Sequence, residues 1–128
     1  MMKRIALLLA LLVFLGGCSM NERENGTMYR QITQEEAKKM MDGQDVIIVD
    51  VREQSEYDAG HIPGAVLLPL GQINEDSAAE AIPEKDAAAL VYCRSGRRSK
   101  IASEMLAQIG YTNIYEFGGI ITWPYEVE

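Results

Sequence analysis

The chain has 128 residues, which is enough for one domain with one hydrophobic core. Hydrophobic residues make up 48% and charged residues 24%, proportions that are ordinary for a globular protein. The formal net charge of −7 becomes −9 without residues 1–17, which carry Lys3 and Arg4 and no acid. This acidic balance excludes general binding of nucleic acid, which requires a basic face.

The first part of the chain has the pattern of an export signal. Lys3 and Arg4 precede an unbroken apolar run over residues 5–15. This run is shorter than the roughly 20 residues of a membrane span, so we expect a signal peptide over residues 1–17. Residues 15–18, Leu-Gly-Gly-Cys, resemble a bacterial lipobox.

The lipobox resemblance implies cleavage before Cys18 and acylation of its thiol, with palmitate among the possible fatty acids. The protein would then be extracytoplasmic and lipid-anchored, on the periplasmic or cell-surface side of a bacterial membrane. The alternative is a plain secretory signal in which Cys18 is incidental. Acylation of Cys18 would leave Cys93, the second of the two cysteines, as a free thiol.

The next residues predict a tether and the start of the domain. Residues 18–28 are polar without periodicity, as expected of a lipidated tether, and one domain is expected over residues 29–128. Residues 29–32 predict a weak first strand. Thr33 and Glu36 form a capping box, which predicts a helix over residues 35–41.

A buried strand is predicted over residues 46–52, because Val46, Ile47, Ile48 and Val49 are β-branched without alternation, as in a parallel sheet. Asp50 and Arg52 lie at its carboxyl end. They form either an exposed ion pair of little energetic value or a brace for the active-site loop, and the pattern alone leaves both possibilities open.

The middle of the chain alternates short elements. We expect a helix over 53–59, a turn over 61–64, a strand over 65–68 and an irregular helix near 77–82. His61 is the only histidine, and in a turn we interpret it as structural. Neither histidines nor cysteines occur in pairs at metal-ligand spacing, so no metal and no cofactor are expected.

The chain is organised around residues 93–99, Cys-Arg-Ser-Gly-Arg-Arg-Ser. The apolar run 88–92 before them predicts a buried strand. Residues 100–109 predict a helix whose apolar face has Ile101, Met105 and Ile109, with Ala102 and Leu106 beside them. A last strand is expected over 112–117 and is broken by Gly118 and Gly119. Repeated alternation of strand and helix predicts an α/β fold with a mainly parallel sheet of about five strands flanked by helices.

A cysteine at the carboxyl end of such a strand lies where open parallel sheets bind ligands. The thiolate is the reactive form of cysteine, and the amides of a loop entering a helix stabilise an anion. Gly96 lets the loop turn, and three arginines, Arg94, Arg97 and Arg98, add positive charge. No candidate base lies within the loop, so we expect the loop itself to activate Cys93.

Three stretches together resemble the rhodanese-like domain family. They are Asp50-Val51-Arg52-Glu53 followed by Glu56-Tyr57 and Gly60-His61-Ile62-Pro63-Gly64-Ala65, the loop at residues 93–99, and Gly118-Gly119-Ile120 with Trp123. The resemblance implies a single-domain sulfurtransferase in which Cys93 carries sulfur as a persulfide. It implies that Arg94, Ser95, Gly96, Arg97, Arg98 and Ser99 form the cradle for the substrate, and that Asp50 and Arg52 support the loop.

The expected partners follow from this resemblance: a small anionic sulfur donor such as thiosulfate, and a thiol, sulfite or cyanide as acceptor. We expect a monomer. A membrane-tethered module that binds sulfide or a redox partner without turning over thiosulfate is an alternative. A cysteine phosphatase or arsenate reductase is disfavoured, because the larger loop of those enzymes has arginine where this chain has Ser99.

Overall fold

The computed structural model describes residues 28–128. A five-stranded sheet forms its centre, with strand order β1-β5-β4-β2-β3 and every neighbouring pair parallel. The strands are β1 (Arg30–Gln31), β2 (Ile47–Asp50), β3 (Val66–Leu67), β4 (Ala89–Cys93) and β5 (Ile114–Gly119). The predicted α/β class with a parallel sheet of about five strands is confirmed.

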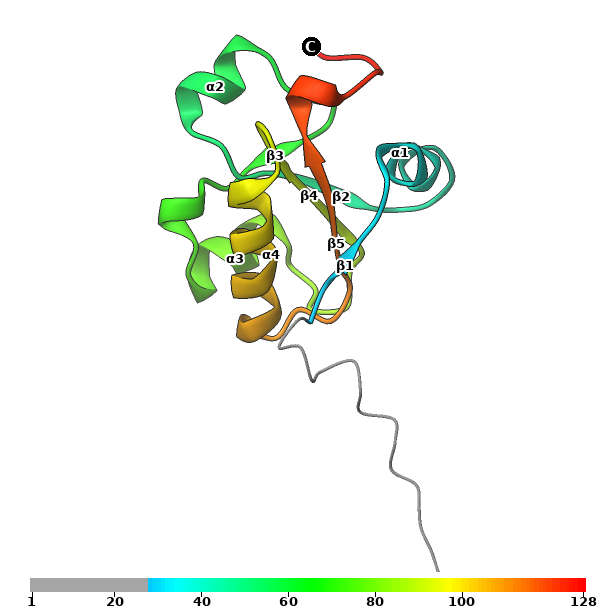
Figure 1. The fold of residues 1–128 in the computed structure, drawn as a ribbon. Helices are drawn as coiled ribbons and strands as arrows, with labels where there is room; N and C mark the ends of the chain where they lie inside the picture. The colour runs from blue at the N-terminus through cyan, green and yellow to red at the C-terminus, as the bar shows by residue number, and fades with distance from the viewer. Residues whose placement is uncertain (1–27) are drawn as a thin grey trace, which may run out of the picture.

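Helices cover both faces of the sheet (Figure 1). They are α1 (Gln34–Gly43), α2 (Gln54–Ala59), α3 (Glu75–Ala81) and α4 (Arg97–Ile109), with short 3-10 turns η2 (Leu70–Gln72) and η3 (Ile120–Thr122). The predicted capping box of Thr33 and Glu36 starts α1. The helix expected near residues 77–82 is instead a regular helix that begins at Glu75, because Asn74 caps it and bonds Ser77 reciprocally.

Two apolar clusters hold these layers together. On the α3 and α4 side, Val49, Val91 and Leu106 belong to a cluster that also includes Cys93. On the α1 side, Leu90, Tyr92 and other residues pack with Phe117 and Trp123. Because successive residues of β4 alternate between the two clusters and all five are buried, this strand is the core of the domain.

Helix α4 packs on the sheet with most of the face that the sequence predicted, and Met105 and Ile109 lie half-buried against the core. Ala102 and Leu106 are fully buried, as expected, together with Ser99 and Ser103. Ile101, predicted on the inner face, is 41% exposed. The reason is that the helix begins at Arg97 and turns Ser99 toward the end of β4, so its inner face passes through Ala102 and Leu106.

None of the helices in residues 28–128 is both long and apolar enough to span a membrane. The expected signal peptide over residues 1–17, Cys18 and most of the expected tether lie outside the residues that the structure describes.

Candidate active site

Cys93 lies at the carboxyl end of β4, where it pairs in register with Gly119 of β5. Its side chain is 1% exposed. The chain then turns through Arg94, Ser95 and Gly96 and enters α4 at Arg97. The predicted strand, loop and helix are thus confirmed, although α4 begins three residues before the expected start at Lys100. Gly96 makes this tight entry possible, because it is the N-cap residue and has a φ of 109°, in the left-handed region.

The backbone amides of this turn converge on the sulfur. Gly96 donates to Cys93 Sγ at 3.0 Å, and the Ser99 amide donates to the same sulfur at 3.3 Å. Burial raises the pKa of the Cys93 thiol, but the hydrogen bond with the Ser99 side chain and those from the amides of Ser99, Gly96 and Ser95 outweigh it, so the pKa lies below its ordinary value. The loop therefore favours the thiolate, which is the nucleophilic form.

The Ser99 side chain connects the sulfur to a buried carboxylate. The Cys93 thiol donates to Ser99 Oγ at 3.4 Å, and the Ser99 hydroxyl donates to Glu116 Oε2 at 2.5 Å. Glu116, in the middle of β5, is only 2% exposed. Glu116 was not among the site residues predicted from the sequence. The one available signal was a glutamate inside an otherwise apolar strand, directly before Phe117 and the two glycines.

The two glycines at residues 118 and 119 do not break the last strand, contrary to the prediction, because β5 continues through both. At Gly119 a Cβ atom would lie 2.0 Å from the Arg94 carbonyl oxygen and 2.5 Å from the Ser95 nitrogen. The loop after Cys93 therefore rests directly on the backbone of β5. The Arg94 carbonyl also accepts a hydrogen bond of 3.2 Å from the Ile121 amide.

Asp50 and Arg52 form a buried ion pair, so the hypothesis of an exposed pair is wrong. Asp50 is 0% and Arg52 5% exposed, with 2.7 Å between Arg52 Nη2 and Asp50 Oδ2. Arg52 also donates to the Gly60 carbonyl. The Tyr92 hydroxyl, one residue before Cys93, donates to Asp50 Oδ2 at 2.5 Å. The pair supports the strand end that carries Cys93 and does not contact the sulfur.

Burial, together with the neighbouring Asp50 carboxylate, raises the pKa of Tyr92, so its hydroxyl remains a donor. The same oxygen accepts a hydrogen bond from the Ile62 amide at 3.1 Å. Tyr92 thus links β2, β4 and the turn at residues 61–64.

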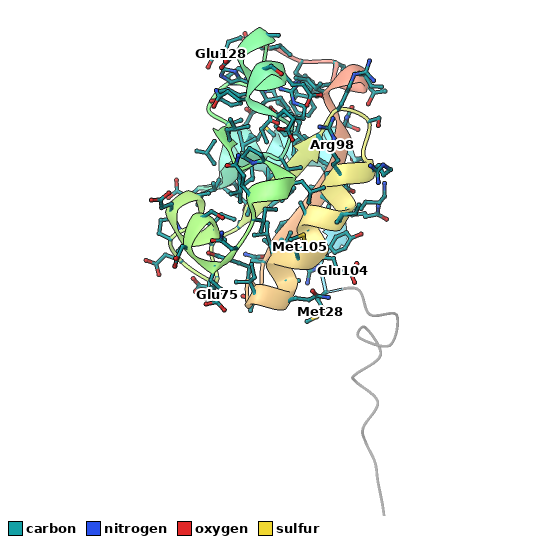
Figure 2. All side chains as sticks on the ribbon, turned by 90° about the vertical axis from the view of Figure 1, so that its left-hand side faces the viewer. Met28, Glu75, Arg98, Glu104, Met105 and Glu128 are labelled. Carbon is teal, nitrogen blue, oxygen red and sulfur yellow. The ribbon has the colours of Figure 1, made fainter. Side chains whose placement is uncertain are left out.

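The three arginines of the loop have different surroundings. Arg98 forms a two-pronged ion pair with Glu56 of α2, at 2.8 Å and 3.0 Å. It lies at the end of α4 where the loop enters (Figure 2). Arg94 and Arg97 are exposed and, among residues 28–128, form no ion pair. Arg94 and Arg97 are thus the two loop arginines whose charges are not paired in the described residues, and binding of an anion by the three arginines stays a prediction.

The family model described as Rhodanese-like domain matches residues 33–123 of the chain. The chain belongs to the rhodanese-like domain family. Thiosulfate sulfurtransferase PspE of Escherichia coli (strain K12) is 39% identical over 72 residues, which are 56% of this chain and 68% of that protein. Thiosulfate sulfurtransferase GlpE of Coxiella burnetii (strain RSA 331 / Henzerling II) is 34% identical over 97 residues, which are 75% of this chain and 88% of that protein.

Solved structures agree with this assignment. A rhodanese with anions from E. coli has a TM-score of 0.61 at 32% identity, covering 66% of this chain and 98% of that chain. A thiosulfate sulfurtransferase from Pseudomonas aeruginosa has a TM-score of 0.71 at 26% identity, covering 84% of this chain and 21% of that chain. At the level of the family, the protein is a rhodanese-type sulfurtransferase, and donors and acceptors of sulfur are its class of substrate.

Two other residues noted in the sequence have packing contacts in the rhodanese-like domain. His61 stacks on Tyr57, with 3.8 Å between ring centroids, and its Nδ1 lies 3.0 Å from the Tyr57 carbonyl oxygen. Trp123 packs against Phe117 and is 8% exposed. Within residues 28–128, no group of three or more histidine, cysteine or acidic residues is arranged to hold a metal ion.

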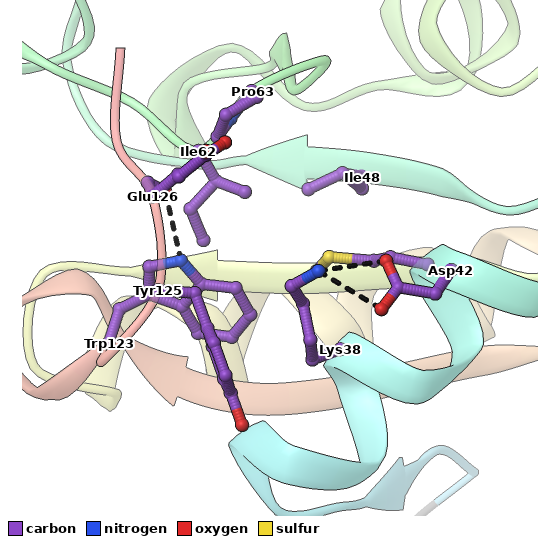
Figure 3. A pocket seen from close by; sticks show the side chains of 9 residues that line it. Lys38, Asp42, Ile48, Ile62, Pro63, Trp123, Tyr125 and Glu126 are labelled. Atoms are coloured by element: carbon purple, nitrogen blue, oxygen red, sulfur yellow. Dashed lines mark hydrogen bonds and ion pairs between the residues drawn. The ribbon is translucent and has the colours of Figure 1, made fainter.

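A pocket of about 230 Å³ lies between α1 and the C-terminal segment of the rhodanese-like domain (Figure 3). Its lining includes Ile48, Ile62, Trp123 and Tyr125, with the ion pair of Lys38 and Asp42 at its edge. No residue of the Cys93 loop lines it. The pocket is therefore separate from the candidate active site.

Proposed function

We propose that this rhodanese-like domain moves a sulfane sulfur from thiosulfate to a thiol, sulfite or cyanide through a Cys93 persulfide. The observation that carries this proposal is the environment of the Cys93 sulfur. It accepts hydrogen bonds from the Gly96 and Ser99 amides, and Cys93 is the last residue of β4, the central strand of the sheet. An anion at this position is stabilised by donors that need no rearrangement.

The proposed reaction has two displacements. The Cys93 thiolate attacks the outer sulfur of thiosulfate, a new S–S bond forms, and the bond to the central sulfur breaks, so that sulfite leaves with the electron pair. The terminal sulfur of the persulfide then carries the negative charge. In the second step the acceptor attacks this sulfur and the Cys93 thiolate leaves. The amides of the loop can hold the anion at each stage.

Two features of the surroundings support a small anionic donor. Arg94 and Arg97 are exposed at the loop of a chain whose formal net charge is −7, so they offer a local positive potential. The named relatives in Escherichia coli and Coxiella burnetii are thiosulfate sulfurtransferases. We infer that Arg97→Ala raises the KM for thiosulfate more than the same substitution at Arg98, whose charge is paired with Glu56.

The geometry of the loop disfavours a phosphatase. Three residues, Arg94, Ser95 and Gly96, separate β4 from α4, and position 99 holds a fully buried serine bonded to Glu116. An arginine at that position would have to displace the packed end of β5. A binding module without turnover remains the alternative that the assay must separate from an enzyme.

The assay follows thiocyanate formation from thiosulfate and cyanide. The Cys18→Ser variant serves as the reference, because it leaves Cys93 as the only cysteine, and Cys93→Ser in the same background is the matched control. We expect thiocyanate with the reference and none with the control, and no phosphatase activity with either. Absence of thiocyanate from a folded reference protein with a titratable Cys93 would contradict thiosulfate as the donor.

A second measurement then distinguishes another donor from a binding module. Intact mass after treatment with polysulfide gains about 32 Da if Cys93 accepts one sulfur atom. A persulfide without thiocyanate would indicate a different sulfur donor. No mass gain would favour the binding module.

We also propose that Cys18 is acylated and that the protein is a lipid-anchored monomer on the extracytoplasmic side of a bacterial membrane. The position of Cys18 directly after the apolar run and the two glycines supports this. Radiolabelled palmitate should enter the wild-type chain in a bacterial host and should not enter Cys18→Ala. Label in the variant, or a wild-type chain without label that leaves with the soluble fraction, would refute the anchor.

A further inference from the structure

The pocket between α1 and the C-terminal segment combines an apolar floor with charged groups at its edge (Figure 3). Ile48, Ile62 and Trp123 contribute hydrocarbon surface, and Ile62 and Trp123 are buried. Asp42 and Glu126 contribute carboxylates, and both of these residues are exposed. An apolar space with a few charged groups is the usual composition of a binding site for a small molecule.

One cation already lies at the edge of this pocket, the ammonium group of Lys38. Its Nζ is 2.8 Å and 3.0 Å from the two carboxylate oxygens of Asp42, and 5.6 Å from the ring centre of Tyr125. Hydrogen bonding with Asp42 raises the pKa of Lys38, and the Glu126 carboxylate acts in the same direction. The edge is therefore built from groups that stabilise a positive charge, namely two carboxylates and the face of an aromatic ring.

The ammonium group of Lys38 does not balance both carboxylates. Lys38 is paired with Asp42, whereas Glu126 forms no ion pair within residues 28–128. One negative charge of the lining is thus in excess. The side chains of Lys38 and Asp42 are 35% and 63% exposed, and an exposed pair of this kind is weak. A second cation can therefore lie beside Glu126, or replace Lys38 at Asp42.

We propose that this pocket binds a small organic cation, a primary amine joined to an apolar body. The ammonium group lies at the edge, near Asp42 and Glu126, and the apolar body lies against Ile62 and Trp123. The volume of about 230 Å³ is below the range of about 300–1,000 Å³ for drug-sized ligands, so the ligand has the size of one ring with a short chain. An organic anion is disfavoured, because Asp42 neutralises Lys38 and Glu126 repels a negative charge.

Trp123 reports on this pocket, because it is the only tryptophan of the chain and belongs to the lining. Its indole Nε1 donates to the Glu126 carbonyl, and its ring packs edge-on against Tyr125. A ligand between these side chains changes the surroundings of the indole and hence its fluorescence. No residue of the Cys93 loop lines the pocket, so the measurement does not depend on the proposed sulfur transfer.

The experiment follows tryptophan emission of the full chain with Cys18→Ser at neutral pH. Three probes share one phenylethyl body: phenethylamine is a cation, phenethyl alcohol is neutral and phenylpropionate is an anion. We expect a saturable change with the amine, with a dissociation constant on the order of 1 mM for a ligand of this size. The alcohol should bind about fivefold more weakly, and the anion should give no saturation.

Two results of this titration would overturn the proposal. One is the absence of a saturable change with phenethylamine. The other is an affinity for the alcohol or for the anion that equals the affinity for the amine, because the pocket would then take any apolar body regardless of its charge.

Glu126→Gln removes the unpaired carboxylate and keeps the carbonyl that accepts from Trp123. It should weaken binding of the amine about twofold to fivefold and leave binding of the alcohol unchanged. Glu84→Gln is the matched control, because it removes the same charge from an exposed residue outside the lining. Equal weakening in both variants would show that the net charge of the protein, and not this pocket, attracts the amine, and would refute the proposal.

Lys38→Met tests the same charge balance in the opposite direction. It removes the ammonium group from the edge of the pocket and leaves Asp42 without its partner, so the amine should bind about twofold to fivefold more tightly. Lys39→Met is the control, because Lys39 is the next residue of α1, is exposed and lies outside the lining. Weaker binding of the amine to Lys38→Met, or an equal gain in both variants, would contradict a cation site at Asp42 and Glu126.

Discussion

Gly119→Ala tests how far the active-site loop depends on contact with β5. Gly119 has φ −138° and ψ 159°, an extended conformation that alanine adopts freely, so the substitution adds no backbone strain. The added Cβ would lie 2.0 Å from the Arg94 carbonyl oxygen and 2.5 Å from the Ser95 nitrogen. Both neighbours are backbone atoms, so no side-chain rotation can relieve the overlap.

The size of the effect follows from these distances. Real Cβ atoms essentially never approach such neighbours within 3.0 Å, so the loop and β5 must separate by about 1 Å. Overpacking of this kind costs about 1–3 kcal/mol, and in a domain of this size each kcal/mol lowers the unfolding midpoint by about 4–8 °C. A displacement of about 1 Å at a catalytic group can also lower a rate by about 100-fold.

The assay compares thermal unfolding and thiocyanate formation for the reference protein, Gly119→Ala and Gly43→Ala. Gly43 is the control because a Cβ there would meet nothing within 4 Å. We expect Gly119→Ala to lose stability and almost all activity, and Gly43→Ala to stay close to the reference in both. A Gly119→Ala protein with unchanged midpoint and unchanged rate would refute the conclusion that the loop rests on the backbone of β5.

Two further predictions concern the ion pairs. Asp50→Ala removes the ion-pair partner of buried Arg52 and the acceptor of the Tyr92 hydroxyl. The free energy of unfolding measured in urea should therefore fall by about 3–5 kcal/mol. A loss below about 1 kcal/mol, which is typical of an exposed pair, would contradict this. The Arg98 guanidinium lowers the pKa of Glu56 from 4.5 to about 2. A carboxyl group whose pKa is lower in the folded than in the unfolded state stabilises the fold at pH values above its unfolded pKa. This stabilisation is lost as the pH falls through the folded pKa. The urea midpoint should therefore fall more steeply between about pH 4.5 and pH 2 in the wild type than in Glu56→Gln; equal slopes would show that the pair does not contribute.

The sequence predicted those parts of the site that depend on neighbouring residues. The apolar run before Cys93, the turn at Gly96 and the helix after it are consecutive, so local patterns suffice to identify them. The buried character of β2 and β4 was likewise visible in their composition. The start of α4 was missed because its entry depends on the left-handed conformation of Gly96 rather than on a capping side chain.

What lies across the sheet could not be predicted in this way. The strand expected to end before Gly118 continues through Gly119, whose missing side chain leaves room for the Arg94 carbonyl of the loop. The burial of Asp50 and Arg52 was not readable from the sequence, and Tyr92, which donates to the aspartate from the adjacent strand, lies 42 positions after Asp50. These facts depend on strand order and register.

The sequence by itself determined the α/β class, the position of Cys93 at the end of a buried strand and the positive charge around it, because strand and helix periodicity and loop composition are properties of contiguous residues. Only the tertiary structure decided which side chains reach the sulfur and which charges remain available. Pairing of β5 beside β4 brings Glu116 to Ser99, 17 positions away, and packing of α2 brings Glu56 to Arg98 across 42 positions. No local pattern encodes such contacts, since they arise when parallel strands align in register and bury polar groups that must then find partners.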